Sequence, residues 1–196
     1  MEKKKQTVKY VFKSGATYDG EWWGKMRHGH GEMTWPDGAR YVGIFSYNEP
    51  SVRGAFTFPN GDKYEGCWSA NRINGYGIFL HAETGIKCIG NWRNDLLHGL
   101  GKEEWPNNES SYVGQFSYGI KEGLGKHTWA DGSEYRGQWT QNKMHGFGIY
   151  KWKDGRSYQG HWVDGLISGF GTYTWRDERK YVGEFLNDKK HGYGVY

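Results

Sequence analysis

A motif of the form Tyr-x-Gly-x-aromatic recurs eight times along the chain, at intervals of 23 or 24 residues. With its first residue counted as position 0, positions 2 and 13 are glycine in every repeat, and position 4 is always Trp or Phe. The repeats begin at Tyr18, Tyr41, Tyr64, Cys88, Tyr112, Tyr135, Tyr158 and Tyr181. A fixed period of this length indicates an array of stacked units, each of which contacts its neighbours.

The shared residues within a repeat are spaced by two, which is typical of β-strands rather than helices. In the first repeat, residues 18–22 would form one strand and residues 29–35 a second. Residues 23–28 are expected to join these strands as a six-residue loop. Residues 36–38, Pro-Asp-Gly, are expected to form a tight turn to the next repeat. Each repeat is therefore predicted to be a β-hairpin.

Glycine and aromatic residues take the place of an aliphatic core. The chain has 32 Gly, 15 Tyr, 11 Trp and 9 Phe, with a mean hydropathy of -0.92. A glycine in a strand often marks the close approach of another group. We expect an aromatic ring from a neighbouring strand to lie flat over each bare backbone. One face of the sheet would carry the rings of positions 0 and 4 and a second-strand row, Trp35, Phe58, Trp105, Trp129, Trp152 and Trp175.

The segments "YDGEWWGKMRHGHGEMTWPDG" and "YVGEFLNDKKHGYGVY" resemble the MORN (membrane occupation and recognition nexus) repeat. The resemblance implies an all-β fold, an elongated, twisted, single-layer antiparallel sheet with a groove: a solenoid of about eight β-hairpins, roughly 75 Å long. The array is assigned to residues 10–196, preceded by a basic tail, residues 1–9. A half-repeat is visible at its start, where Phe12 and Gly15 fall on repeat positions.

Several repeats depart from the pattern. Ser51 and Val52 replace the usual His-Gly, and Asn108 and Glu178 replace the turn glycine in the fourth and seventh repeats. The two 24-residue repeats are adjacent, between Tyr64 and Ser111, and a bend or bulge is expected there.

No catalytic, metal or cofactor site is expected from the sequence. Histidine recurs at position 10, but never in adjacent repeats, which lie about 10 Å apart, whereas zinc needs ligand atoms about 2 Å from one ion. These histidines are interpreted as loop residues that hydrogen-bond the hairpin: His28, His98, His145 and His191. Cys67 and Cys88 have opposite strand parity, which disfavours a disulfide. The glycine-rich segments open no helix, so a phosphate-binding loop is rejected.

The aromatic rows are the predicted partner-binding site. A single-layer sheet cannot cover both faces, and an open aromatic groove would suit a protein partner such as an amphipathic helix. The assigned groove residues are Tyr18, Trp22, Trp68, Trp92, Phe116, Tyr135, Trp139, Tyr158, Trp162 and Phe185. The loop edge carries eight basic residues against five acidic ones, a net charge of +3 that is interpreted as solvated. Lipid contact through Lys143, Lys189 and Lys190 is the alternative.

These observations predict a non-enzymatic scaffold that binds proteins and not nucleic acid. The resemblance implies a cytoplasmic, cytoskeletal setting, with a ciliary axoneme or radial spoke as the first choice; the alternative is a membrane-apposed module that binds phosphoinositides. The N-terminus lacks the apolar segment of a secretory signal. The last strand, from Gly192 to Tyr196, is expected to offer a bare edge for association with a second copy.

Overall fold

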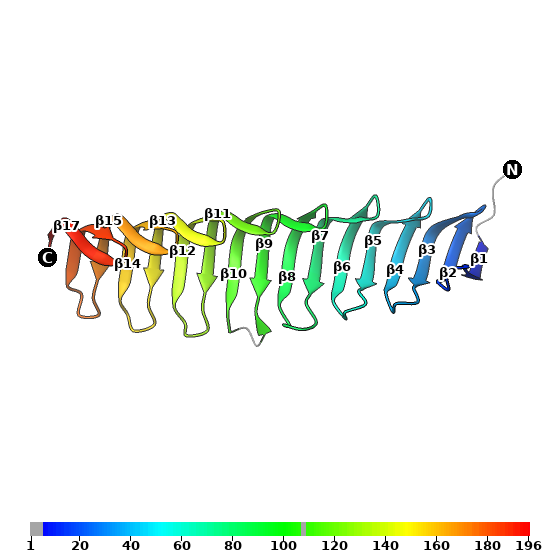
Figure 1. Ribbon diagram of the computed structural model, residues 1–196, viewed down its shortest axis with the longest axis horizontal. Coiled ribbons are helices and arrows are strands. Elements are labelled where there is room, and N and C mark those ends of the chain that lie inside the picture. The colour runs from blue at the N-terminus through cyan, green and yellow to red at the C-terminus, as the bar shows by residue number, and fades with distance from the viewer. Residues whose placement is uncertain (1–5, 107–108) are drawn as a thin grey trace. The chain divides into compact units, whose positions relative to one another are not determined.

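The computed structural model describes residues 6–106 and 109–196, in two compact units, Met1–Leu97 and His98–Tyr196. The described chain forms seventeen β-strands, which within each unit follow one another in chain order in Figure 1. The first eight are β1 (Gln6–Val11), β2 (Thr17–Trp23), β3 (Met26–Thr34), β4 (Arg40–Ser46), β5 (Glu49–Thr57), β6 (Lys63–Ser69), β7 (Arg72–Leu80) and β8 (Lys87–Arg93). The others are β9 (Leu96–Glu104), β10 (Ser111–Ser117), β11 (Ile120–Thr128), β12 (Glu134–Thr140), β13 (Lys143–Lys151), β14 (Ser157–Val163), β15 (Leu166–Thr174), β16 (Lys180–Leu186) and β17 (Lys189–Val195).

Each unit is an open antiparallel sheet of repeating hairpins. In the N-terminal unit β1 to β8 pair in sequence, and in the C-terminal unit β9 to β17 do the same. Glycines of positions 2 and 13 lie opposite each other, as Gly137 and Gly148 do. The all-β hairpin prediction is therefore confirmed. No helix in the described part of the chain has the length and hydropathy to cross a membrane.

The predicted six-residue loop is wrong. β12 ends at Thr140 and β13 begins at Lys143, so Gln141 and Asn142 alone form the turn, both with positive φ. Two residues in this conformation match the twist of the flanking strands. The second strand of the hairpin is consequently nine residues long and carries the side chains that had been assigned to the loop.

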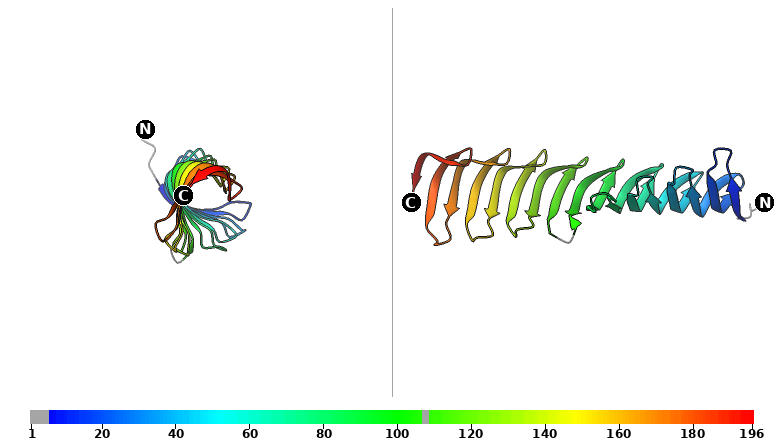
Figure 2. Two further views of the ribbon diagram at one scale, coloured as in Figure 1. Left: turned by 90° about the vertical axis from the view of Figure 1, so that its left-hand side faces the viewer. Right: turned by 60° about the horizontal axis from the view of Figure 1, so that its bottom comes forward.

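A β-bulge interrupts most hairpins just after the paired glycines, a feature that the sequence did not indicate. In the sixth repeat Gly137 pairs with Gly148, but Gln138 pairs with His145, so the second strand has two extra residues. The side chain of Gln138 closes the gap, because its Oε1 accepts a hydrogen bond from the Phe147 amide at 2.7 Å. Bulges bend strands and increase their twist. The end-on view in Figure 2 shows the strongly curved strands.

The position 0 tyrosine lies over the glycine of the adjacent strand, as predicted. A Cβ on Gly148 would overlap the ring of Tyr135, and a Cβ on Gly137 would overlap the Gly148 backbone. The Tyr135 hydroxyl donates a hydrogen bond to the carbonyl of Gln138, the bulge residue, at 2.9 Å. The tyrosine thus spans the bare glycine pair and ties itself to the bulge.

The core is a zipper of perpendicular rings. Tyr135 is 0% exposed and lies edge-to-face between Trp139 of its own repeat and Trp162 of the next, with ring centroids 5.3 and 5.4 Å apart. The same arrangement recurs at Tyr18, Tyr41, Tyr64, Tyr112 and Tyr158. Burial raises the pKa of Tyr135 well above its usual value. We call the face that carries these rings the inner face.

The turns between hairpins are as tight as the sequence predicts. Trp129 and Ser133 close one such turn through a backbone hydrogen bond of 2.9 Å, and Gly132 within it has φ +87°. In the third repeat the additional residue lies in the turn between β7 and β8, and the register of these strands is regular. The additional residue thus adds no bulge between β7 and β8, while the same repeat has the bulge common to most hairpins between Gly66 and Trp68. Asn108, predicted to replace a turn glycine, lies outside the described residues.

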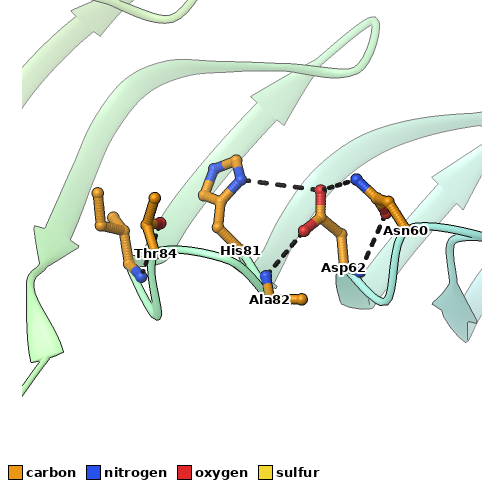
Figure 3. Close-up of polar contacts among 6 residues, drawn as sticks. Asn60, Asp62, His81, Ala82 and Thr84 are labelled. Carbon is orange, nitrogen blue, oxygen red and sulfur yellow. Dashed lines mark hydrogen bonds and ion pairs between the residues drawn. The ribbon is translucent and has the colours of Figure 1, made fainter.

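Neighbouring turns also contact one another. Figure 3 shows Asp62, in the turn after β5, accepting a hydrogen bond from the Ala82 amide at 2.8 Å in the turn after β7. The same carboxylate lies 3.8 Å from Nδ1 of His81. The hydrogen bond that the Ala82 amide donates is the main reason that the pKa of Asp62 lies below its usual value.

A second contact between repeats occurs at the two-residue turns, and we call it the turn clamp. The Asn142 side chain accepts a hydrogen bond from the Lys121 amide at 2.8 Å, while the Asn142 amide donates to the Lys121 carbonyl at 3.2 Å. The clamp uses Asn or Asp at position 7 and joins two repeats at their backbones. It is formed by Asn48, Asp95, Asn142 and Asp188.

The turn clamp is incomplete between the second and third repeats and between the sixth and seventh. Asn71 faces Pro50, which has no amide hydrogen to donate. Gly165 has no side chain, so only its amide bonds the Met144 carbonyl, at 2.8 Å.

The array begins earlier than the sequence suggested. β1 starts at Gln6, within the segment assigned to the basic tail, and pairs with β2 from Gln6 opposite Trp22 to Val11 opposite Thr17. It is the second strand of a half-repeat, as the spacing of Phe12 and Gly15 indicated. Lys3, Lys4 and Lys5 lie outside the described residues.

Candidate protein-binding face

The ring rows that were assigned to an open groove are buried. Trp139 is 5% exposed and Trp162 is 4% exposed, and Trp22 is the least buried of the assigned residues. Each buried indole also donates a hydrogen bond inward, as Trp139 does to the Gly125 carbonyl at 3.3 Å. These rows hold the repeats together and offer no surface to a partner, because the bent second strand and the next repeat cover them.

A different row of rings, six of them half-exposed, runs along the inner face of the C-terminal unit. We call this row the aromatic ladder, and it consists of Trp105, His127, Trp129, Tyr150, Trp152, Tyr173, Trp175 and Tyr196. Consecutive ring centroids are 4.4 to 6.1 Å apart. The residues occupy positions 15 and 17 of their repeats. Trp129, Trp152 and Trp175 end their strands and belong to the tight turns, whose backbone hydrogen bonds fix them in place.

The corresponding row in the N-terminal unit is less regular. It contains Trp35, Phe56, Phe58, Phe79 and His81, with centroids 4.6 to 5.8 Å apart. Only one indole occurs in this row, against four in the aromatic ladder. The inner faces of the two units therefore differ in the number of indole N–H donors that they present.

Two basic residues of the loop edge, Lys121 and Arg27, lie among the rings and not on a solvated edge, which corrects the prediction for them; Lys190 is exposed but also contacts a ring. Lys121 Nζ is 2.8 Å from Glu103 and lies over the rings of Trp105 and Tyr112, at 5.0 and 4.9 Å. Arg27 contacts the rings of positions 0 and 4, and burial lowers its pKa. Lys190 lies 4.5 Å from the Trp175 ring centroid. Such cation–π contacts stabilise the rings that they cover.

Sequence comparison matches the MORN repeat eight times, at residues 18–40, 41–63, 64–82, 88–110, 112–134, 135–155, 158–178 and 181–196. These matches cover most of the chain. The chain belongs to the MORN repeat family.

Among curated proteins, ALS2 C-terminal-like protein of Homo sapiens is 31% identical over 115 residues, and the Mus musculus protein matches to the same extent. The match covers 56% of this MORN repeat chain but 9% of each relative. Among solved structures, the TCP domain of Drosophila melanogaster SAS-4 in complex with a proline-rich motif of Ana2 has a TM-score of 0.49 and 14% identity, over 90% of this chain and 88% of that one. The TCP10 domain of Danio rerio CPAP with a STIL peptide has a TM-score of 0.35 and 13% identity, over 91% and 84%.

One rung of the aromatic ladder is a buried histidine. His127 is 8% exposed, its Nε2 lies 3.0 Å from the Ser110 hydroxyl, and its Nδ1 has no hydrogen-bond partner among the described residues. Burial, with a smaller effect of Lys121, lowers its pKa to about 4. The ring is therefore neutral in the folded protein at neutral pH, whereas an unfolded chain would protonate it below its ordinary pKa.

Acidification from about pH 7 to about pH 5 is expected to lower the free energy of unfolding by about 2 kcal/mol through His127 alone. The loss begins near the unfolded pKa of about 6.5 and ends near the folded value of about 4. Urea unfolding at several pH values measures it. His127→Tyr, which copies Tyr150 one repeat later, is the matched control. An equal loss in the variant would show that His127 is not the group responsible.

The other histidines of the MORN motif have varied roles. His98 lies in β9 and not in a loop, and its Nδ1 accepts a hydrogen bond from the Tyr118 amide of the next repeat at 3.3 Å, so the loop interpretation is wrong for it. His28 and His145 have a buried Nδ1 without a hydrogen-bond partner in the described chain, although that of His145 lies 4.0 Å from Asp164, and His191 is exposed. The residues at 6–106 and 109–196 contain no group of three or more potential metal ligands.

The outer face carries an exposed apolar row that the sequence reasoning missed. Position 12 lies between the two glycines of the second strand and is apolar or aromatic in six MORN repeats: Tyr76, Leu100, Leu124, Phe147, Phe170 and Tyr193. Leu124 and Phe147, with Val113 and Ile149, line a shallow depression of about 700 Å³. The recurrence of apolar residues at this position was the signal that could have revealed the row.

Proposed function

We propose that this MORN repeat chain is a non-enzymatic scaffold that binds a protein partner along the aromatic ladder. The observation that carries the proposal is that these rings stay half-exposed beside a core of fully buried ones. Exposed, pre-positioned Trp and Tyr side chains are the residue types that dominate binding energy at protein interfaces. Because the turn hydrogen bonds already fix their positions, little conformational entropy would be lost on binding.

For the setting we propose a cytoplasmic, cytoskeletal assembly such as a ciliary axoneme, on the basis of the resemblance to MORN repeat scaffolds. Imaging the tagged protein beside an axonemal marker tests the setting. A distribution confined to membranes would contradict it and would favour the lipid alternative.

Trp152→Ala is expected to weaken capture of the native partner at least tenfold, because Trp152 lies at the centre of the exposed indoles. Capture from the source cell, followed by quantitative mass spectrometry, identifies the partner, and titration of the purified partner measures the change. Phe147→Ala on the outer row is the control and is expected to change affinity less than twofold. The reverse ranking of the two variants would place the binding site on the outer face.

Lipid binding is the second candidate, and it depends on Lys143, Lys189 and Lys190. All three side chains are exposed, but Lys190 also donates a hydrogen bond to the Tyr196 hydroxyl at 2.7 Å. Three basic residues give a weak membrane attraction, at about 1 kcal/mol each near an anionic surface. Flotation with anionic vesicles that is strong in the native protein and lost on charge reversal of all three residues would favour this candidate over the scaffold.

A further inference from the structure

We propose that the aromatic ladder is specific for a proline-rich segment in the polyproline II conformation, with an acidic residue at the end that meets Lys190. This inference rests on the proposed function and names the class of its partner. The relevant residues are Trp129, Trp152 and Trp175, which recur at the same position in three successive repeats.

The first argument is the spacing of the indoles. Each repeat adds two strands, and strands lie about 4.8 Å apart, so equivalent indoles are about 9.6 Å apart. A polyproline II helix has three residues per turn and rises about 3.1 Å per residue, so every third residue returns to the same side after about 9.3 Å. Successive prolines on one side of such a helix would therefore meet successive indoles with almost no accumulated mismatch.

Other backbone conformations fit this spacing less well. In an α-helix the nearest equivalent residue is seven positions away, after about 10.5 Å, and it has rotated by about 20°. An extended strand presents side chains on one side every 6.6 Å or so, which does not divide into one repeat. An amphipathic helix, the partner type expected from the sequence, would thus lose register with the indoles after two or three repeats.

The second argument is hydrogen bonding. The buried indoles of position 4 donate to glycine carbonyls, as Trp162 does to Gly148 at 3.4 Å. Within the described chain the indole N–H groups of Trp129, Trp152 and Trp175 form no hydrogen bond, and they are not among its buried unpartnered atoms. They are open donors. A polyproline II helix has no internal hydrogen bonds, so its carbonyl groups are free to accept from them.

The third argument is charge. Arg156 and Arg179 lie over the rings of Trp152 and Trp175, but each already pairs with an aspartate of its own turn, at 2.7 and 2.8 Å. Lys190 lies over Trp175 and has no carboxylate partner in the part of the chain that the structure describes. An acidic residue next to the proline segment would supply that partner. The ladder thus offers flat rings, open N–H donors and, at its end, Lys190 without a carboxylate partner in the described chain.

The test follows the indole N–H resonances of ¹⁵N-labelled full-length protein, one for each of the 11 tryptophans. The probe is a peptide of about ten prolines, enough to span three indoles, followed by two aspartates. The resonances of Trp129, Trp152 and Trp175 are expected to move together and to saturate. Those of Trp68 and Trp139, whose N–H groups donate to Gly54 and Gly125, are expected to stay in place.

Three variants separate the contribution of the indole N–H donor to peptide binding from that of the Lys190 charge. Trp152→Phe keeps a ring and removes the donor, and it is expected to weaken peptide binding about fivefold. Lys190→Gln is expected to abolish the preference for the aspartate-ended peptide over a lysine-ended one. Trp35→Phe, in the N-terminal unit, is the matched control and is expected to have no effect.

The proposal is overturned if the proline peptide leaves all three indole resonances unmoved, or if a leucine-heptad helical peptide moves them at a tenfold lower concentration. The second outcome would leave the protein-binding scaffold standing and would replace its partner class. If neither peptide moves them, and Trp152→Ala also captures the native partner normally, the scaffold proposal fails as well.

Discussion

Trp139→Ala is expected to cost about 4 kcal/mol of folding free energy, in the range for removing a buried aromatic side chain. Trp139 packs edge-to-face against Tyr112 and Tyr135, with centroids 5.2 and 5.3 Å away, and so joins two repeats. Its removal leaves a cavity between them and the Gly125 carbonyl without its indole donor. Equilibrium urea unfolding measures the change.

Two variants calibrate this result. Trp139→Phe is expected to cost about 1 kcal/mol, because Phe116 and Phe185 occupy the same position in other repeats and an aromatic ring remains there, while the N–H bond is lost. Trp152→Ala should cost about 2 kcal/mol, since a half-exposed ring buries less area. Equal losses for Trp139→Ala and Trp152→Ala would refute the division into a buried core row and an exposed ladder.

Gly148→Ala is expected to cost about 3 kcal/mol, because the new methyl group would overlap the Tyr135 ring. The ring cannot move away without losing both neighbouring indoles and its hydrogen bond to the Gln138 carbonyl. Thermal and urea unfolding report the loss. Gly148 does not have the positive φ that restricts other residues, so the cost arises from overlap and not from backbone strain.

Gly132→Ala is the matched control for that prediction. Gly132 has φ +87° and nothing within 4 Å of an added Cβ. The only expected cost of the variant is the strain of a left-handed backbone at a non-glycine residue, about 1 kcal/mol. If Gly148→Ala lowers the free energy of unfolding no more than Gly132→Ala does, the Tyr135 ring does not lie in close contact with the backbone of Gly148.

The hairpin fold could be predicted because its signals are local. Residues spaced by two give strands, and glycine next to an aromatic residue gives a close approach. The bulge could not be predicted, since it also forms where Ile44 or Cys67 stands in place of Gln138 and so follows no single side-chain signal. In the fifth repeat the bulged hairpin carries Lys121 on its second strand, where the cation lies over rings instead of in a loop.

The candidate site, too, could be predicted from the sequence only in part. Strand parity correctly placed Trp139 and Trp152 on one face of the sheet, but parity cannot tell which of two rows on that face becomes buried when the sheet bends. In the bent sheet Trp139 is buried and Trp152 stays half-exposed. The rings assigned to the groove are thus mostly buried, and the rings that carry the proposal had been identified as part of the same face.

The turn clamp gives the molecule a unit of construction larger than its sequence repeat. Within each unit, complete clamps join the first repeat to the second, the third to the fourth, the fifth to the sixth and the seventh to the eighth. The joint at Gly165 keeps one of the two bonds, and neither forms at Pro50 within the described residues. A pair of hairpins, and not a single hairpin, is therefore the smallest part of the array that contains a complete turn clamp. Lengthening or shortening such an array by two hairpins would preserve this alternation of strong and weak joints, whereas a change of one would put it out of phase.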